Sequence, residues 1–341
     1  MKTEPKMLRV ETGCLTKYRL RFSTDEFMDY HVYENIPRWW RWIEQILRMD
    51  IYLAMRVKRV VNQYDIIWAN SEKVALPLSL MGIKKPLVVI LQHPESPLKV
   101  ILLKLTGIAR KWAGIGIVSH ESRAFLEKKL DIEPKRIFQY YSARLDRFKP
   151  DPGFRDVDGP IMSIGVAKRD YKTLIAALSG LTGYRSEIFV SSKYGDKYQG
   201  GKGHKIADWI SFPERIPDDE LVGRYQQARF VVIPLMPTSH SGAGVTTAFE
   251  AGASGKAVIA TRTGGMQAYI KDGETGILVP PYDVNAMRNA IRKLWENPDL
   301  AKQMGLAGRK YLETQYNYEI INPTMTQFLI DLWKAYDKDN S

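Results

Sequence analysis

The segment from residue 229 to 281 constrains the fold more than any other part of the chain. An apolar run at 230–235 predicts a buried strand, and a turn-rich stretch separates it from a helical pattern at 245–253. A second apolar run at 257–260 predicts the next strand. This order of elements is a β-loop-α-β unit, whose two strands lie parallel in one sheet with the helix packed across them.

The turn before the predicted helix has the composition of an anion-binding site. Its small residues let a ligand approach the backbone closely, and the helix start offers unpaired N–H groups and the positive end of the macrodipole to a diphosphate. Two threonine hydroxyls could add donors, and a glutamate one turn further could accept hydrogen bonds from ribose hydroxyls. An ordinary turn with a solvated glutamate explains the same pattern, because a lone Gly-x-Gly is a weak signal. The candidate donor-binding residues here are Gly242, Ala243, Gly244, Val245, Thr246, Thr247 and Glu250.

The same segment resembles the donor-site motif of the GT-B glycosyltransferases of family four, a large retaining group. In that family a Glu-Gly-Phe-Gly stretch precedes a helix, which leads into Glu-Ala-x-Ala-x-Gly-x-Pro-Val-Ile-Ala. Residues 249–260 are similar to the second half of this motif, and residues 264–265 and 272–281 are similar to the family's next segments. The family's first Glu would fall at Gly242, or at Ser241 with a one-residue gap, so it is absent. Its absence leaves the identity of the donor sugar open.

The resemblance extends over roughly residues 110–320 and implies a fold as well as a site. The family has two Rossmann-like, doubly wound parallel-sheet domains that face a cleft, and 341 residues are enough for two domains. We expect an N-terminal acceptor-binding domain at 1–150 and a C-terminal donor-binding domain for the nucleotide sugar at 151–319. A C-terminal helix at 320–336 is expected to cross back to the first domain. The Pro/Gly-containing polar stretch 151–159 places the boundary.

Three side chains are candidates for the chemistry. His93 follows the apolar run 87–91, at the carboxyl end of a predicted strand, where open α/β sheets bind ligands. The resemblance implies that a histidine there lies near the donor sugar. Lys168 and Arg169 follow the predicted strand 160–165, where the family has cations facing the diphosphate. Such cations stabilise the departing diphosphate most in the transition state. A structural histidine and two solvated loop cations are the alternative.

The resemblance also implies how the rest of the reaction proceeds. Main-chain groups near Arg215 and Ile216 are expected to hold the nucleotide base, and the reaction is expected to retain anomeric configuration without a metal. No cofactor is expected beyond the nucleotide-diphosphate sugar itself. The single cysteine, Cys14, excludes a disulfide framework and a Cys-rich metal site.

Positive charge is unevenly distributed along the chain. Residues 1–150 hold 27 Lys and Arg against 16 Asp and Glu, a net charge of +11 out of the total of +12. Two basic amphipathic segments, 37–61 and 97–112, lie in this half, and the first carries tryptophans flanked by arginines, which suits a membrane interface. We therefore expect a lipid-linked or saccharide acceptor, an anionic membrane surface as partner, and a cytoplasmic, peripheral location at the inner face of the cytoplasmic membrane. Core helices with solvated basic faces explain the segments equally well.

Other functions fit parts of the pattern. The pI near 9.5 is typical of nucleic-acid-binding proteins, but no nucleic-acid motif is present and no such partner is expected. A sugar-nucleotide epimerase of the same architecture and a catalytically silent relative used as a scaffold are the remaining alternatives, and the missing first Glu favours the latter. The sequence predicts neither a signal peptide nor a stretch long enough to span a bilayer.

Overall fold

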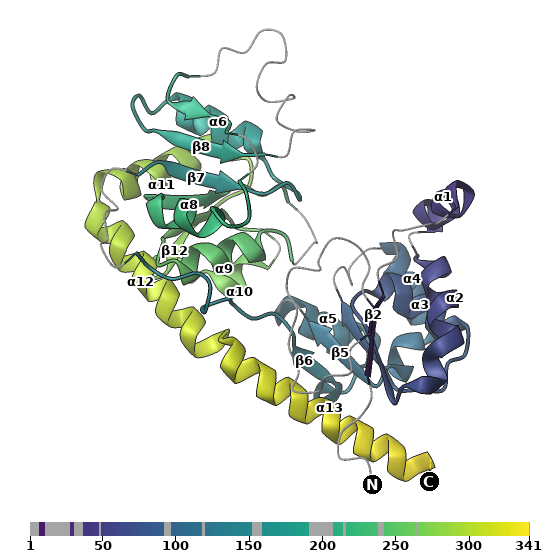
Figure 1. Ribbon diagram of the computed structural model, residues 1–341. Helices are drawn as coiled ribbons and strands as arrows, with labels where there is room; N and C mark the ends of the chain where they lie inside the picture. The colour runs from purple at the N-terminus through teal and green to yellow at the C-terminus, as the bar shows by residue number, and fades with distance from the viewer. Residues whose placement is uncertain are drawn as a thin grey trace. The chain divides into compact units, whose positions relative to one another are not determined.

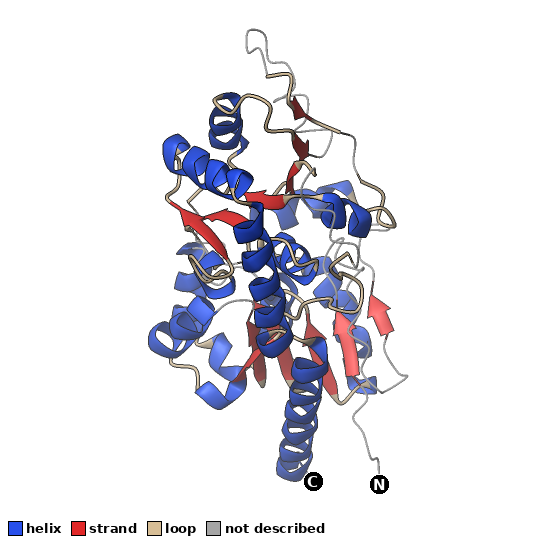
Figure 2. Cartoon of the chain, turned by 90° about the vertical axis from the view of Figure 1, so that its left-hand side faces the viewer, coloured by secondary structure: helices blue, strands red, loops and turns tan. Residues whose placement is uncertain are grey.

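The chain divides into two compact units. One comprises residues 1–141 together with 319–341, and the other comprises residues 142–318. Each unit has a parallel sheet covered by helices (Figures 1 and 2). The computed structural model describes residues 7–10, 28–30, 37–47, 49–91, 97–117, 120–151, 159–190, 207–213, 216–237, 242–263 and 265–340.

The first unit is built on a parallel sheet. Its described strands follow the order β2-β1-β3-β4-β5-β6, and every pairing between neighbours is parallel. The three central strands are fully buried, as expected when helices cover both faces of a parallel sheet. The strands are β1 (Met7–Val10), β2 (Met28–Tyr30), β3 (Ile66–Ala69), β4 (Leu87–Leu91), β5 (Gly114–Ile117) and β6 (Ile137–Gln139).

Helices cover the two faces of this sheet with separate hydrophobic clusters. On one face the long helix α13 contributes Met325, Leu329 and Trp333, which pack with Trp68 and Phe138 of the strands. The larger cluster on the other face includes buried side chains of α2 and α3. The helices of this unit are α1 (Arg38–Leu47), α2 (Ile51–Val60), α3 (Glu72–Leu80), α4 (Pro97–Thr106), α5 (His120–Leu130) and α13 (Tyr318–Asn340), with 3-10 turns η1 (Val61–Gln63), η2 (Ile108–Lys111) and η3 (Pro134–Arg136).

The second unit has a sheet of the same kind. Its described strands follow the order β12-β11-β10-β7-β8-β9, again with parallel pairings. The strands are β7 (Ile161–Ile164), β8 (Ser186–Phe189), β9 (Ile210–Ser211), β10 (Phe230–Ile233), β11 (Val258–Thr261) and β12 (Gly276–Val279). The helices are α6 (Tyr171–Ser179), α8 (Leu221–Gln227), α9 (Val245–Ala253), α10 (Met266–Tyr269), α11 (Val284–Glu296) and α12 (Pro298–Gln315).

The order of strands in the second unit contains a topological switch point. The chain runs outward from β7 to β8 and β9 on one side, and from β10 to β11 and β12 on the other. The connections after β7 and β10 therefore leave the same edge of the sheet and diverge. Open α/β sheets bind ligands in the crevice at such a point. The described residues of the connections that form it include 165–170, 234–237 and 242–244.

The division between the units lies after Tyr141, nine residues before the start of the second domain expected at Asp151. Residues 143–150 belong with the second unit because they pack on it. The Ala143 amide donates to the Tyr316 carbonyl at 2.7 Å, and the Phe148 carbonyl accepts from Arg309 Nη1 at 2.7 Å. The polar composition on which the expected boundary was based lies mostly in 152–158, outside the described residues.

The observed division also changes the distribution of charge. The first unit holds 26 Lys and Arg against 19 Asp and Glu, a net charge of +7, and the second holds 24 against 19, a net charge of +5. Arg144, Arg147 and Lys149 belong to the second unit, and α13 adds acidic residues to the first. The excess of positive charge, which the sequence places in residues 1–150, is thus shared between the two folded units.

Candidate functional site

The turn at the start of α9 requires glycine for two reasons. Gly244 has φ +82°, a left-handed conformation that costs other residues roughly 1–2 kcal/mol. A Cβ at this position would lie 2.9 Å from Ile233 Cγ2 at the end of β10. The first helical hydrogen bond runs from the Ala248 amide to the Gly244 carbonyl at 2.9 Å, and the Val245 amide donates to the Gly242 carbonyl at 3.4 Å, so the amides of residues 246 and 247 precede the helical ladder. An anion at this turn would meet these amides and the positive end of the helix.

The two connections at the switch point are tied to each other by backbone bonds. Arg169 and Leu235 form an antiparallel bridge, and the Met236 amide donates to the Lys168 carbonyl at 2.9 Å. The Asp170 amide donates to the Pro234 carbonyl at 2.9 Å, while its side chain caps α6 by accepting from the Thr173 amide at 3.2 Å. The candidate cations therefore lie on a fixed loop beside the connection that leads to α9.

Arg169 is held inside this loop. Its side chain is 6% exposed. Its guanidinium donates to the Ile164 carbonyl through Nε (3.3 Å) and Nη2 (3.0 Å), to the Ala167 carbonyl through Nη1 (3.0 Å), and to Thr247 Oγ1 through Nη2 (3.1 Å). Burial lowers the pKa of Arg169, and the nearby hydroxyls of Tyr171 and Tyr225 oppose that effect. The positive charge is thus placed behind the first turn of α9, bonded to one of its threonines.

Lys168 has the opposite environment. It is exposed, and its φ of +56° is unusual for a residue with a side chain. The neighbouring Gly165 has φ +121°, and a Cβ there would overlap the Arg169 guanidinium. The backbone of this loop therefore exposes Lys168 and buries Arg169. Backbone strain of this kind is common at functional sites.

Glu250 lies in the second turn of α9 and is 8% exposed. Its Oε2 accepts a hydrogen bond from the hydroxyl of Tyr225, a fully buried residue of α8, at 2.8 Å. The Tyr225 ring meets Phe148 edge-on, with centroids 5.7 Å apart. Sequence reasoning missed Tyr225, because one tyrosine in a short helical pattern is indistinguishable from an ordinary core residue.

An aromatic cluster supports α9 from within the unit. The Phe249 ring lies 5.1 Å from Tyr269 and 5.0 Å from Tyr316, and Tyr316 lies 5.8 Å from Tyr311. The hydroxyls of Tyr311 and Tyr316 both donate to the Ala268 carbonyl, at 3.0 and 3.3 Å. Burial raises the pKa of Tyr316, with Tyr311 adding to the effect. The cluster joins α9, α10 and the end of α12.

The structure brings most of the predicted donor-site residues together in the second unit. Gly242 to Thr247 form the turn and first turn of α9, with Glu250 beyond them and Lys168 and Arg169 on the adjoining loop. Ile216 is half-buried, before α8. His93, Arg215 and Ser241 lie outside the described residues. No group of three or more His, Cys, Asp or Glu side chains in the described ranges is placed to hold a metal ion.

The amphipathic segments of the first unit expose apolar side chains. Segment 37–61 forms two helices, and on α1 Trp39, Trp42 and Ile46 are 60%, 65% and 59% exposed. Their spacing of three and four places them on one helix face. Trp40 instead packs on the core and stacks on Trp39, with ring centroids 4.9 Å apart. We call Trp39, Trp42 and Ile46 the α1 stripe.

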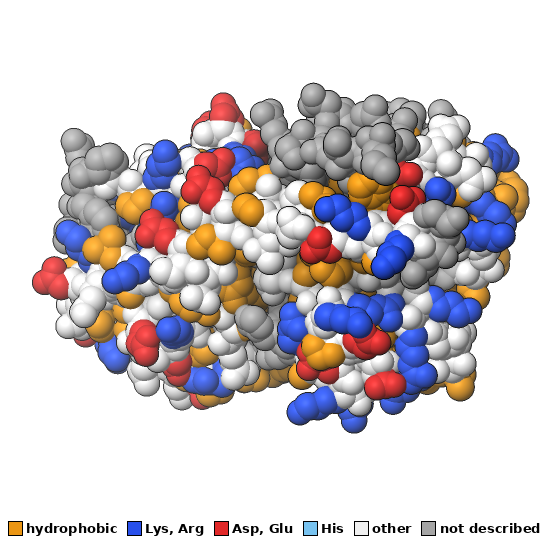
Figure 3. Space-filling view, turned by 90° about the horizontal axis from the view of Figure 1, so that it is seen from below, with side chains coloured by type: hydrophobic (Ala, Val, Ile, Leu, Met, Phe, Trp, Pro, Cys, Tyr) orange, Lys and Arg blue, Asp and Glu red, His pale blue; other side chains and the backbone are white. Residues whose placement is uncertain are grey.

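The second segment, 97–112, is split by Gly107 into α4 and η2. Ile101 and Leu105 of α4 are 54% and 82% exposed, whereas Ile108 is buried. Exposed cations near these helices in the chain are Arg41, Arg56, Lys58, Arg59 and Lys104. Figure 3 shows Lys and Arg side chains gathered toward the right of the face that it presents, with hydrophobic side chains among them. Within the described part of the chain, no helix combines the length and apolarity needed to cross a membrane.

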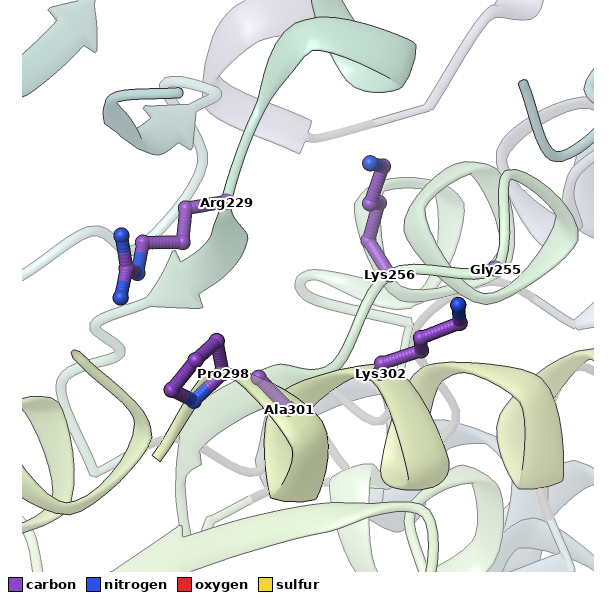
Figure 4. A pocket seen from close by; sticks show the side chains of 6 residues that line it. All are labelled: Arg229, Gly255, Lys256, Pro298, Ala301 and Lys302. Atoms are coloured by element: carbon purple, nitrogen blue, oxygen red, sulfur yellow. The ribbon is translucent and has the colours of Figure 1, made fainter. Parts of the chain in front are cut away.

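A shallow pocket of the second unit lies apart from the α9 turn. Arg229 precedes β10 and Lys256 precedes β11, so the pocket is at the amino ends of these strands, whereas the α9 turn follows their carboxyl ends. In Figure 4 the Arg229 guanidinium points away from both lysines, and it lies 4.4 Å from the Trp295 ring centroid. The cations therefore do not converge on one point. The lining residues are Arg229, Gly255, Lys256, Pro298, Ala301 and Lys302.

Comparison with known proteins identifies the class of this site. Residues 201–311 match the family Glycosyl transferases group 1. The chain is 25% identical, over 94% of its own length and 91% of the relative's, to the GDP-mannose-dependent alpha-(1-6)-phosphatidylinositol monomannoside mannosyltransferase of Mycolicibacterium smegmatis. It is 28% identical to the D-inositol 3-phosphate glycosyltransferase of Thermobifida fusca over 55% of this chain, and that match spans only 41% of the relative's length.

A solved structure shows the same fold. The crystal structure of Anabaena HepE in complex with UDP-glucose has a TM-score of 0.73 and 15% identity, covering 96% of this chain and 99% of that one. The predicted fold class, two Rossmann-like parallel-sheet domains of the GT-B type, is confirmed, and so is the resemblance to group 1 glycosyltransferases. The match to the Glycosyl transferases group 1 family lies in the second unit and includes the α9 turn, so the site resembles those of glycosyltransferases.

Proposed function

We propose that this protein is a glycosyltransferase that moves a sugar from a nucleotide-diphosphate sugar to an acceptor hydroxyl, with retention of anomeric configuration and without a metal. The observation that carries the proposal is the turn at Gly244. It begins α9 at the switch point of the sheet of the second unit, and the buried Arg169 lies behind it. The group 1 family match covers this turn and supports the assignment.

Each donor-site residue has a role in this proposal. The amides of residues 246 and 247 and the Thr246 hydroxyl bind the diphosphate, and Glu250 accepts hydrogen bonds from the ribose. Lys168 faces the phosphates from its exposed position, while Arg169 adds positive potential through Thr247 without leaving its carbonyl partners. The base is assigned to main-chain groups near Ile216, and the roles expected for Arg215 and His93 concern residues outside the described ranges.

The chemistry depends on the charge that develops during the reaction. The bond between the anomeric carbon and the β-phosphate oxygen breaks, and negative charge grows on the departing diphosphate. Preorganised amides and cations stabilise that charge more in the transition state than in the ground state. The acceptor oxygen forms the new bond on the same face of the sugar, and its proton passes to the departing phosphate.

The acceptor in this proposal is lipid-linked or another saccharide, bound at the inner face of the cytoplasmic membrane. The α1 stripe supports this part, because exposed tryptophans beside arginines suit the boundary between headgroups and acyl chains. The M. smegmatis relative is named for phosphatidylinositol monomannoside, and a lipid-linked acceptor is consistent with that name. A basic residue near an anionic leaflet contributes about 1 kcal/mol.

A thermal-shift panel of UDP-, GDP-, ADP- and CDP-sugars tests the donor assignment. A ligand that binds only the folded state stabilises it by about 2.7 kcal/mol at a hundredfold excess over Kd. One nucleotide should raise the melting temperature, and Glu250→Ala should abolish most of that rise. Glu274→Ala is the matched control, since Glu274 is an exposed glutamate of the same unit. Equal shifts in wild type and Glu250→Ala would remove the ribose assignment.

Flotation with liposomes tests the membrane part. The protein should float with vesicles containing an anionic phospholipid and remain at the bottom with neutral ones. Absence of binding to both kinds would remove the membrane surface from the proposal and leave the donor assignment untouched.

A second candidate function is suggested by the missing motif glutamate. Gly242 stands where the family has a carboxylate for the donor sugar, so a chain that binds the nucleotide but transfers nothing would be a silent relative acting as a scaffold. Release of free sugar or nucleotide without any acceptor would instead indicate an epimerase. Product analysis by mass spectrometry, with and without a lipid extract as acceptor, separates these outcomes.

A further inference from the structure

We propose that Tyr225 is a positioning residue for the donor nucleotide, whose hydroxyl holds the Glu250 carboxylate in the orientation that receives the ribose. This inference rests on the ribose role of Glu250 in the proposed function. The Tyr225 hydroxyl donates to Glu250 Oε2 at 2.8 Å, and the two residues come from different helices, α8 and α9. The hydrogen bond thus joins two elements that approach the site separately.

Glu250 needs such a partner because it is almost fully buried. A carboxylate that is 8% exposed has lost most of its water, and a hydroxyl donor replaces part of that solvation with a charge-assisted hydrogen bond. The long glutamate side chain also loses rotamer freedom when it is fixed. Fixing it before the nucleotide arrives removes this entropy loss from the binding step.

Tyr225 is itself fixed by packing. Its side chain is fully buried, and its ring meets Phe148 edge-on at 5.7 Å with an interplanar angle of 87°. Phe148 is 1% exposed, and its carbonyl accepts from Arg309 Nη1 of α12 at 2.7 Å. The hydroxyl therefore has a defined position whether or not a ligand is present.

The same tyrosine lies close to the diphosphate end of the site. Tyr225 is among the groups whose proximity raises the pKa of Arg169 against the effect of burial, and Arg169 bonds Thr247 in the first turn of α9. A carboxylate offers about four acceptor positions, so donation from Tyr225 is compatible with simultaneous donation from ribose hydroxyls. Tyr225 thus bonds the ribose-binding carboxylate and also contributes to the electrostatic surroundings of Arg169.

The test is Tyr225→Phe, which keeps the ring and removes only the hydroxyl. Isothermal titration calorimetry with ADP, CDP, GDP and UDP identifies the nucleotide that binds, and its 2′,3′-dideoxy form measures recognition of the ribose. We expect Tyr225→Phe to bind the ribonucleotide five- to tenfold more weakly, to bind the dideoxy form as wild type does, and to raise KM for the sugar nucleotide with little change in kcat.

Tyr184→Phe is the matched control. Tyr184 also donates to a glutamate, Glu296 Oε1 at 3.1 Å, in the same unit but on α11 and away from the α9 turn. This variant should retain wild-type affinity and the wild-type preference for ribose. A purely structural role for Tyr225 would lower the melting temperature without changing the ratio of ribo- to dideoxy-nucleotide affinity.

Glu250→Gln separates the failure of this inference from the failure of the proposed function. If Glu250→Gln keeps the preference for ribose, the ribose role of Glu250 is wrong and the inference with it, and if no nucleotide binds, the proposed function is wrong as well. If Glu250→Gln loses the preference while Tyr225→Phe keeps it, only the role of Tyr225 is overturned. The double variant should bind no more weakly than Glu250→Gln alone, and an additive loss would show that Tyr225 acts elsewhere.

Discussion

Gly244 illustrates how much of the site is decided by a single residue. Its left-handed backbone and the close approach of Ile233 both exclude a side chain. Sequence reasoning selected this residue because small residues at a helix start let an anion approach the backbone closely, and it did not predict the left-handed φ. It did not predict that Arg169 would turn inward, since that depends on the carbonyl groups of Ile164 and Ala167, which only the folded loop brings together.

We expect Gly244→Ala to destabilise the second unit and weaken nucleotide binding. Gly183→Ala is the control, because Gly183 has the same φ of +82° but nothing within 4 Å of an added Cβ. Gly183→Ala should cost roughly 1–2 kcal/mol for the left-handed backbone alone. Gly244→Ala should lower the free energy of unfolding by more than this, because the added Cβ would also crowd Ile233. Chemical denaturation measures both, and equal losses would mean that Ile233 moves aside freely.

Lys168 permits a test in which stability and activity respond differently. Lys168→Gly relieves the left-handed strain at φ +56° and removes an exposed ammonium group. The melting temperature should therefore stay the same or rise, while turnover falls about tenfold or more because a cation facing the phosphates is lost. Tyr282→Gly, at φ +60° in the same unit, is the control and should leave turnover unchanged. Full activity in Lys168→Gly would show that Arg169 alone supplies the cation.

At the scale of elements, the aromatic cluster makes the stability of the second unit dependent on pH. Burial raises the pKa of Tyr316 above its usual value near 10, so the folded state keeps a proton that the unfolded state loses. Stability is therefore complete below about pH 10 and falls as the pH rises above it. We expect the melting temperature to fall as the pH rises from about 10, and to fall less in Tyr316→Phe. Parallel curves for the two proteins would contradict this.

The α1 stripe is an element whose function the sequence indicated without locating its residues. Helical spacing predicted an apolar face, but only the folded chain shows that Trp40 packs inward while Trp39 and Trp42 face outward. Trp39→Ser with Trp42→Ser should reduce flotation with anionic vesicles about tenfold or more without changing nucleotide binding. Leu80→Ser removes another exposed apolar side chain of the same unit and should leave flotation unchanged. Equal flotation of all variants would place the membrane contact elsewhere.

At the scale of the whole molecule, the fold class was predictable because several buried strands are short apolar runs with their own turn signals. The domain boundary was not, since contacts of Phe148 and Ala143 rather than composition decide where the second unit begins. Net charge per unit, +7 and +5, likewise depends on that boundary. Electrostatic attraction to a membrane should therefore come from local cations near α1 and α4 rather than from the charge of a whole unit.

The second unit is one continuous stretch of chain, so it should fold by itself. Residues 142–318 expressed alone should unfold cooperatively and bind the same nucleotide as the full chain, within about threefold in Kd. Residues 1–141 expressed alone should bind a hydrophobic dye and unfold without a sharp transition, because α13 is missing. Calorimetry and dye fluorescence check both fragments. A well-folded fragment 1–141 would show that α13 is dispensable.

The return of α13 to the first sheet has a consequence for biosynthesis. A ribosome releases residue 318 before the helix that carries Met325, Leu329 and Trp333 has emerged. The second unit is therefore complete before α13 can cover Trp68 and Phe138 of the first unit. Synthesis of the first unit begins before that of the second but ends after it, because α13 is translated last. A nascent chain stalled within α13 would therefore expose an apolar face of the first sheet to which a chaperone could bind.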